Sequence, residues 1–154
     1  KPLAAAAKKP GRTHQIVCYL VDEKLFLIDL PGYGYAKTSQ ESQEKWSLAI
    51  DSFLQGQLNL QICWLLDSRR EELSEEDRQF LKWLAKNPLP CLIVFTKTDK
   101  LKNAEKKALL QKAKILTAIQ AEFPLLTFDK TINYSIKEGI CRKLLLNKLQ
   151  EGFL

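Results

Sequence analysis

The sequence lacks the features that several classes of protein depend on. No apolar run within its 154 residues approaches the length of a membrane span, so we expect no membrane association. The start, Lys1 to Pro10, is small and basic and has no apolar block like that of a secretory signal, which predicts a cytoplasmic protein. The only histidine, His14, has no evident ligand partners, and the four cysteines form no C-x-x-C pair. A zinc site and disulfides are therefore disfavoured, and we expect buried, reduced thiols.

What is present is the composition of an ordinary globular protein. Hydrophobic residues make up 45% of the chain, and the length is sufficient for one domain with its own core. No internal repeat or linker interrupts it, so we expect residues 1–154 to form a single domain that acts as a monomer. The net charge of +6 is compatible with an RNA-rich or phosphate-bearing partner, although many solvated surfaces carry as much.

The first half of the chain predicts a hairpin followed by a helix. Two runs with strand composition, Ile16 to Val21 and Leu25 to Asp29, are separated by a short turn and read as antiparallel partners. Thr38-x-x-Glu41 is a capping box that opens a helix, which Gly56 closes. The apolar face of this helix consists of Trp46, Ala49, Ile50, Phe53 and Leu54.

The second half alternates strands with helices. The near-continuous apolar run Leu60 to Leu66 fits a parallel strand covered on both faces, Cys91 to Phe95 is another buried strand, and a weaker strand lies within residues 125–134. Helices begin at Ser74, Asn103 and about Glu138. Their apolar positions are Phe80, Leu81 and Leu84, then Leu109, Ala113, Leu116 and Phe123, then Ile140, Leu144, Leu145 and Leu149. The alternation predicts an α/β fold, a mostly parallel sheet with helices on both faces and one antiparallel hairpin.

A polar loop follows the second strand of the hairpin. Asp29 stands at its carboxyl end and is followed by Leu30, Pro31 and Gly32. Ligands of open α/β sheets bind at the carboxyl ends of strands, so Asp29 is placed to hold a metal-bound water. Gly32 lets the backbone approach a phosphate closely. An ordinary strand-ending turn explains the same residues equally well.

A second polar loop, Thr96-Lys97-Thr98-Asp99, follows the buried strand at Phe95. The carboxylate of Asp99 can accept both N–H groups on the Watson–Crick edge of a guanine, a donor pair that adenine does not present. The stem of Lys97 can lie along the plane of the base. By itself this loop is more simply a surface turn, but two such loops in this order are more specific. A third loop, Tyr134-Ser135-Ile136, is placed for backbone contacts to the guanine oxygen.

Together these motifs resemble the EngB family of bacterial GTP-binding proteins, also called YihA or YsxC. The resemblance runs from about Lys9 to the C-terminus, and its specific parts are Lys9-Pro-Gly-Arg-Thr-His-Gln15, Asp29-Leu-Pro-Gly-Tyr-Gly-Tyr-Ala-Lys37, Leu66-Asp-Ser-Arg-Arg70 with Glu75-Glu-Asp77, and Thr96-Lys-Thr-Asp99. It implies a GTPase-type G domain that switches between GTP and GDP, acts in assembly of the large ribosomal subunit, with its rRNA and proteins, and is needed for normal division and septation.

The same resemblance implies a nucleotide site with Mg²⁺. Thr13 would give its hydroxyl to the ion and its backbone N–H to the γ-phosphate, Asp29 would hold the ion through a water, and Gly32 would bond the γ-phosphate. The two loops would order with GTP and relax after hydrolysis. The implied nucleotide contacts are Gly11, Arg12, Thr13, His14 and Gln15, then Asp29, Leu30, Pro31 and Gly32, then Thr96, Lys97, Thr98 and Asp99, and finally Tyr134, Ser135 and Ile136.

Three departures from the family pattern qualify this hypothesis. The sequence contains no G-x-x-x-x-G-K-[ST], the P-loop that cradles phosphates, so we expect a G domain without its first strand and P-loop. Tyr33 stands where many G proteins have a water-orienting Gln, which predicts slow intrinsic hydrolysis. The third loop has Tyr134-Ser135 where a Ser-Ser or Ser-Ala pair is usual.

Three functions remain open. The chain is a GTPase switch, or a remnant that binds protein or RNA without turning over nucleotide, or an unrelated α/β domain whose motifs arise by chance. Arg12, Arg69 and Arg70 also predict a salt-sensitive contact with an RNA-bearing partner, for which a solvated surface is the alternative.

Overall fold

The computed structural model describes residues 16–21, 23, 25–30, 48, 50–53, 60–101, 104–128 and 130–151. The chain falls into two compact units, Lys1–Gly56 and Gln57–Leu154, and each is considered by itself. The single domain expected from the sequence stays a prediction. Within the described ranges, no helix combines the length and the apolar character needed to cross a bilayer.

The first unit contains the predicted hairpin. β1 (Val17–Val21) pairs with β2 (Leu25–Asp29) in antiparallel register, with Val17 opposite Asp29 and Val21 opposite Leu25. Glu23 lies in the turn between them with φ 55°, a left-handed conformation suited to a tight reversal. None of the strand residues is buried. The hairpin is therefore confirmed as a pair of strands with little core of its own.

Part of the predicted helix after the hairpin is also present. Residues 48 and 50–53 are helical, and Ile50 is buried as its place on the apolar face predicted. The capping box at Thr38 and the closing Gly56 lie outside the described residues.

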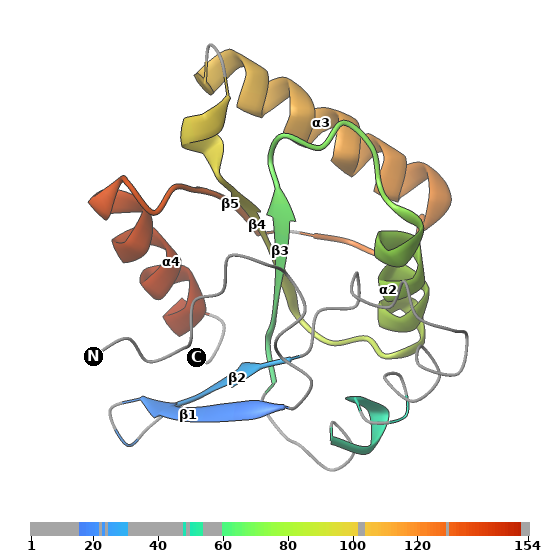
Figure 1. Ribbon diagram of the computed structural model, residues 1–154. Coiled ribbons are helices and arrows are strands. Elements are labelled where there is room, and N and C mark those ends of the chain that lie inside the picture. The colour runs from blue at the N-terminus through green and yellow to red at the C-terminus, as the bar shows by residue number, and fades with distance from the viewer. Residues whose placement is uncertain are drawn as a thin grey trace. The chain divides into compact units, whose positions relative to one another are not determined.

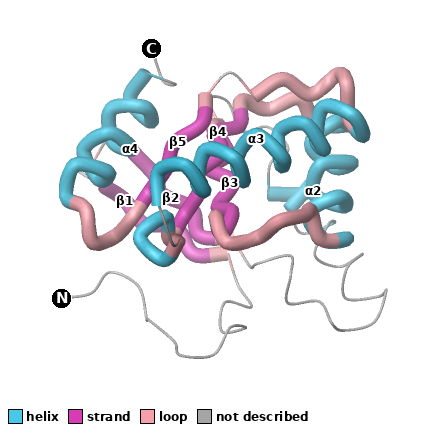
Figure 2. Tube along the Cα trace, turned by 90° about the horizontal axis from the view of Figure 1, so that it is seen from above, coloured by secondary structure: helices cyan, strands magenta, loops and turns pink. Residues whose placement is uncertain are grey.

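The second unit is a parallel sheet between helices. β3 (Ile62–Asp67), β4 (Cys91–Thr96) and β5 (Thr131–Tyr134) are ordered β3-β4-β5 and are all parallel. The helices are α2 (Glu75–Lys86), α3 (Ala104–Glu122) and α4 (Gly139–Glu151), with a 3₁₀ turn, η2 (Thr98–Lys100), after β4. In Figures 1 and 2, α4 lies on one side of these strands and α2 on the other. The α/β class and the alternation predicted from the sequence are confirmed.

The central strand buries both of its faces. Leu92 and Val94 of β4 pack with Ile132 in a cluster that Leu145 and Leu149 of α4 cover. The alternate residues Ile93 and Phe95 point to the opposite face. There Trp64, opposite Ile93, contacts the Phe80 ring of α2 at 5.1 Å between centroids. Because its apolar residues are buried on both faces, β4 is the strand around which the core of this unit packs.

The neighbouring strand β3 departs from its prediction. Trp64 and Leu66 are buried, but Cys63 is exposed and Leu65 is 63% exposed, so the strand is covered on one face only. The reason is that β3 lies at the edge of the described sheet, whereas the residues of α4 pack on β4 and β5. The expectation of buried thiols is wrong for Cys63 and also for Cys18, whereas Cys141 is buried as expected and Cys91 is half-buried.

The helices begin as predicted but differ in their buried faces. Ser74 caps α2 through a capping box with Asp77, and Phe80, Leu81 and Leu84 are buried. On α3 the buried positions are Ala108, Gln111, Ile115 and Ile119, whereas Leu109 and Ala113 of the predicted set are exposed. On α4 the inner positions are Cys141, Leu145 and Leu149, whereas Ile140 and Leu144 are exposed. The prediction is confirmed for Leu145 and Leu149, and it is wrong for the exposed residues because both helices carry apolar residues on two faces.

Candidate functional site

The loop predicted to bind guanine, Thr96-Lys97-Thr98-Asp99, begins at the last residue of β4; it is called the guanine loop or guanine motif below. The hydroxyl of Thr96 donates to the carbonyl of Leu66 at 3.0 Å, and the carbonyl of Thr96 accepts from the backbone N–H of Ser68 at 2.9 Å. These bonds tie the carboxyl ends of β3 and β4 together. The residues after each strand therefore leave from the same edge of the sheet, which is where ligands of α/β folds bind.

Lys97 leaves the strand with an unusual backbone. Its φ is 61°, in the left-handed region that few non-glycine residues occupy. Its side chain is 55% exposed, and its ammonium lies 3.0 Å from Oδ2 of Asp67, the last residue of β3. The lysine that was predicted to lie along a base thus has an acidic partner on the neighbouring strand.

Asp67 is held in place by Arg69. The backbone N–H and Nε of Arg69 donate to Oδ1 at 3.1 and 2.9 Å, and Nη2 donates to Oδ2 at 2.6 Å. The Arg69 bond is the main cause that holds the pKa of Asp67 well below its usual range; desolvation opposes it, and Lys97 reinforces it. Asp67 is therefore an ionised anchor shared by two cations.

Asp99 lies in η2 with its carboxylate turned toward the loop after β5. Oδ1 accepts from the hydroxyl of Ser135 at 3.0 Å, and Oδ2 lies 3.6 Å from Nζ of Lys137. Desolvation raises the pKa of Asp99, but the Ser135 bond and the charges of Lys137 and Lys100 outweigh it and hold that pKa below its ordinary value. An ionised carboxylate is the acceptor that a guanine edge requires.

The third loop is brought to the guanine motif through Ser135. This residue is fully buried, its hydroxyl also accepts from the backbone N–H of Lys137 at 3.1 Å, and its carbonyl accepts from Glu138 N–H at 3.2 Å. Tyr134 ends β5 and packs on the apolar cluster under α4, while Ile136 is 88% exposed. Ser135 is therefore the member of this loop that contacts the guanine motif.

The remaining predicted contacts fall in the first unit. Asp29 ends β2 with an exposed side chain, and Leu30 is half-buried. Gly11, Arg12, Thr13, His14, Gln15, Pro31 and Gly32 lie outside the described residues. Among the described residues, the predicted contacts that the structure brings together are those within residues 96–99 and 134–136.

Of the two residues predicted to hold Mg²⁺, Asp29 is described by the structure. Thr13, the predicted ligand, is outside the described residues, and within them no group of three or more His, Cys, Asp or Glu side chains is arranged to hold a metal. The exposed carboxylate of Asp29 at a strand end suits the contact through water that was predicted, since Mg²⁺ keeps several of its waters.

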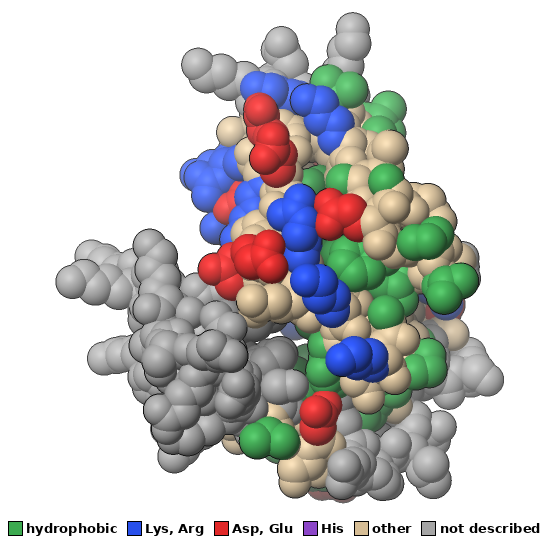
Figure 3. Space-filling view, turned by 90° about the vertical axis from the view of Figure 1, so that its right-hand side faces the viewer, with side chains coloured by type: hydrophobic (Ala, Val, Ile, Leu, Met, Phe, Trp, Pro, Cys, Tyr) green, Lys and Arg blue, Asp and Glu red, His purple; other side chains and the backbone are tan. Residues whose placement is uncertain are grey.

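Two of the basic residues predicted to contact RNA, Arg69 and Arg70, have acidic partners, and Arg12 lies outside the described residues. Arg69 pairs with Asp67, and Nη1 of Arg70 lies 2.7 Å from Oδ2 of Asp77, a carboxylate with only 1% exposure. On the face seen in Figure 3, basic side chains form a band with acidic side chains beside it. An RNA contact through these arginines stays a prediction, and their neutralisation would also remove structural ion pairs.

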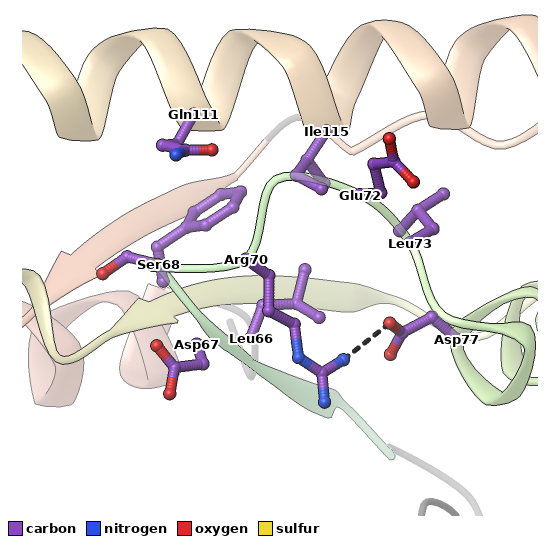
Figure 4. Close-up of a pocket in the computed structure, with 10 residues that line it drawn as sticks. Leu66, Asp67, Ser68, Arg70, Glu72, Leu73, Asp77, Gln111 and Ile115 are labelled. Atoms are coloured by element: carbon purple, nitrogen blue, oxygen red, sulfur yellow. Dashed lines mark hydrogen bonds and ion pairs between the residues drawn. The ribbon is translucent and has the colours of Figure 1, made fainter.

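Two hollows among the described residues of the second unit are not lined by the predicted nucleotide contacts. The loop after β3 encloses a space of about 10 Å³ against α3, lined by Ser68, Gln111 and Ile115 among others (Figure 4). It has room for about one water molecule. A second, open hollow of about 490 Å³ is lined by Gln61, Cys91 and Lys130, at the amino ends of the strands. It lies at the opposite end of the sheet from Asp99.

Sequence reasoning missed Asp67 and Lys137 as partners of the guanine motif. Asp67 carried a signal, because it ends an apolar strand as Asp29 does and precedes two arginines. Lys137 carried none that distinguishes it from other surface lysines.

Comparison with known proteins agrees with these motifs. The chain matches the family described as 50S ribosome-binding GTPase over residues 1–97. It is 39% identical over 118 residues to the probable GTP-binding protein EngB of Cytophaga hutchinsonii, covering 77% of this chain and 56% of the relative. It is 43% identical over 108 residues to that of Solibacter usitatus, covering 70% and 56%. The chain thus spans a little over half the length of these relatives.

The fold has a counterpart among solved structures. A crystal structure of a probable GTP-binding protein engB superimposes with a TM-score of 0.62, at 20% identity, over 90% of this chain and 83% of that one. That likeness concerns the fold alone. With the family match extending through β4 to Lys97 and with curated relatives at 35–43% identity, the chain belongs to the family of 50S ribosome-binding GTPases, and its relatives there are EngB GTP-binding proteins.

Proposed function

We propose that this protein is a guanine-nucleotide switch that binds GTP and GDP through Lys97, Asp99 and the loop at Ser135. The observation that supports it is the Asp99 carboxylate, ionised and oriented by the 3.0 Å bond from Ser135 at the carboxyl edge of a parallel sheet. Fixing the acceptor in advance reduces the entropy lost when a base edge binds. One Asp99 oxygen carries the Ser135 bond, and lone pairs of both oxygens remain for the two N–H groups of guanine.

The family resemblance assigns the phosphate and metal contacts to residues of the first unit. Thr13 and Gly32 would contact the γ-phosphate, and Thr13 together with Asp29, through a water, would hold Mg²⁺. The ion would supply positive charge against the phosphates during hydrolysis of GTP to GDP and phosphate. Asp29 ends a strand pair with little buried surface. Loops carried on such a pair can order and relax at low cost, as a switch requires.

We further propose that the switch acts in the cytoplasm on the large ribosomal subunit during its assembly, and that normal division and septation depend on it. The support is family membership and a net charge of +6, which suits an RNA-rich partner. Sedimentation of the protein with purified large subunits, with a GTP analogue and with GDP, tests this step. A switch should co-sediment more with one nucleotide state than with the other, and equal binding in both would contradict it.

The nucleotide assignment is tested by specificity. Binding of GDP, ADP and XDP to the 154-residue chain is followed by NMR through the backbone amides of residues 96–99. Guanine recognition predicts shifts with GDP and none with ADP. Asp99→Asn should move the preference from GDP to XDP, because the amide offers a donor to the altered edge. Equal GDP and XDP responses before and after this substitution would overturn the assignment.

A second candidate is a binding module without nucleotide turnover. Such a module would not require the G-x-x-x-x-G-K-[ST] motif, which the sequence does not contain. Fusing the amino-terminal part of the Cytophaga hutchinsonii relative to this chain separates the two candidates. The switch predicts tight GDP binding and GTP hydrolysis by the fusion; subunit binding that is indifferent to nucleotide in both proteins would favour the module.

A further inference from the structure

The two charged residues of the guanine loop, Lys97 and Asp99, have their partners on opposite sides of β4. Lys97 pairs with Asp67 at the end of β3, and Asp99 pairs with Ser135 and Lys137 after β5. Since β4 lies between β3 and β5, the partners of the two residues lie on opposite flanks of the central strand. The Lys97 ammonium therefore lies at the end of β3 and not beside the Asp99 carboxylate.

The contact between Lys97 and Asp67 fixes the direction of the Lys97 side chain. Asp67 is immobilised first, by three hydrogen bonds from Arg69, and its side chain is only 19% exposed. Lys97 then reaches it from a left-handed backbone position with φ 61°. A single bond to a half-exposed ammonium contributes little to stability. Its effect is to select one course for a long side chain that otherwise samples many rotamers.

We propose that Asp67 is a positioning residue for guanine binding, which rests on the function proposed above. Asp67 holds the Lys97 ammonium at the end of β3, so the aliphatic stem of Lys97 is extended and presents a flat apolar surface, called the wall below. A planar base packs against that wall while Asp99 accepts from its edge. Without Asp67 the stem is free, and the base must order it on binding.

The first test needs no nucleotide. ¹⁵N relaxation of the Lys97 side-chain nitrogen reports its order directly, and Asp67→Asn should lower that order. Glu71→Gln is the matched control, because it removes one negative charge from the same loop at an exposed position without contact to Lys97. Unchanged order of Lys97 in Asp67→Asn would overturn the proposal.

The second test asks whether Asp67 acts through Lys97. Asp67→Asn should weaken GDP binding by about three- to tenfold, as expected for one lost ordering contact, and Glu71→Gln should leave it unchanged. In the Lys97→Ala background Asp67→Asn should have no further effect. An equal loss in both backgrounds would assign Asp67 a different role.

Failure of the wild type to prefer GDP over ADP would instead refute the guanine site itself. The order of Lys97 would still report on the Asp67 contact in that case.

Discussion

The β1–β2 hairpin and the β3-β4-β5 sheet are built from similarly apolar sequences but reach opposite degrees of burial. In β2, the adjacent residues Phe26 and Leu27 are 63% and 55% exposed, so both faces of the strand are open. In β4, the adjacent residues Ile93 and Val94 are 0% and 1% exposed. Strand composition therefore predicts the element in both regions, while burial depends on which helices cover it.

This difference matches the division of the proposed site. The guanine loop extends from the buried sheet, where Thr96 and Ser135 fix its ends by hydrogen bonds. Asp29 extends from the open hairpin. A base-reading group benefits from a rigid support, whereas a segment that responds to the γ-phosphate must be able to rearrange. Stability measurements on the two regions can break or sharpen this comparison.

The largest effect is expected in the core of the sheet. Ile93→Ala should lower the free energy of unfolding of residues 57–154 by about 2–5 kcal/mol, since it leaves a cavity in a fully buried position. Leu27→Ala, its counterpart on the hairpin, should change stability by less than about 0.5 kcal/mol. Denaturant unfolding followed by far-UV circular dichroism, which reports on both units, measures both. Similar losses from the two substitutions would remove the distinction.

A smaller loss is expected where the loop after β3 meets α2. Asp77 accepts from the backbone N–H of Ser74 at 2.8 Å and from Arg70 at 2.7 Å while almost completely buried. Asp77→Ala should cost about 2 kcal/mol, because it leaves the Ser74 N–H without its acceptor and removes half of the capping box. Glu75→Ala, at an exposed position in the same turn, is the control and should cost only a few tenths of a kcal/mol through the helix dipole. A loss in Asp77→Ala no greater than in the control would show that the ion pair adds nothing.

Acid should act on the second unit through Asp67. Its pKa is depressed in the folded protein, so its contribution is complete above the unfolded value near 3.8 and is lost as the pH falls below that value toward the folded pKa. Asp67→Asn should therefore reduce the pH dependence of stability below about pH 4. Because the pair is open to solvent, the difference should be at most about 1 kcal/mol. Parallel stability curves for both proteins between pH 2 and 4 would contradict the depressed pKa.

The smallest effect concerns the ion pair between α2 and α3. Nε and Nη2 of Arg78 donate to Glu122 at 2.8 and 3.1 Å, with both side chains about one-third exposed. A double-mutant cycle with Arg78→Gln and Glu122→Gln should give a coupling of about 0.5 kcal/mol that decreases with added salt. A coupling that salt does not change would indicate a buried pair.

Local signals explain which parts of the structure could be predicted. The hairpin, the Ser74 cap and the strand at β4 each follow from residues adjacent in sequence, and each is confirmed. The buried faces of α3 and α4 followed only in part, because the exposed Leu109 and Ile140 are as apolar as the residues actually buried. The contact between Lys97 and Asp67 joins residues 30 positions apart and depends on the register of two strands. Periodicity within one segment carries no information about that register.

The contact between Ser135 and Asp99 also sets an order of events during synthesis. The hairpin joins residues adjacent in the chain, so it can close as soon as Asp29 has emerged from the ribosome. The orienting hydroxyl for Asp99 arrives 36 residues after it, and β5 must first pair with β4. A nascent chain therefore completes the surroundings of the Asp99 carboxylate only after β5 and Ser135 have emerged. A chain released early, before Ser135, would carry the guanine motif without the hydroxyl that orients it.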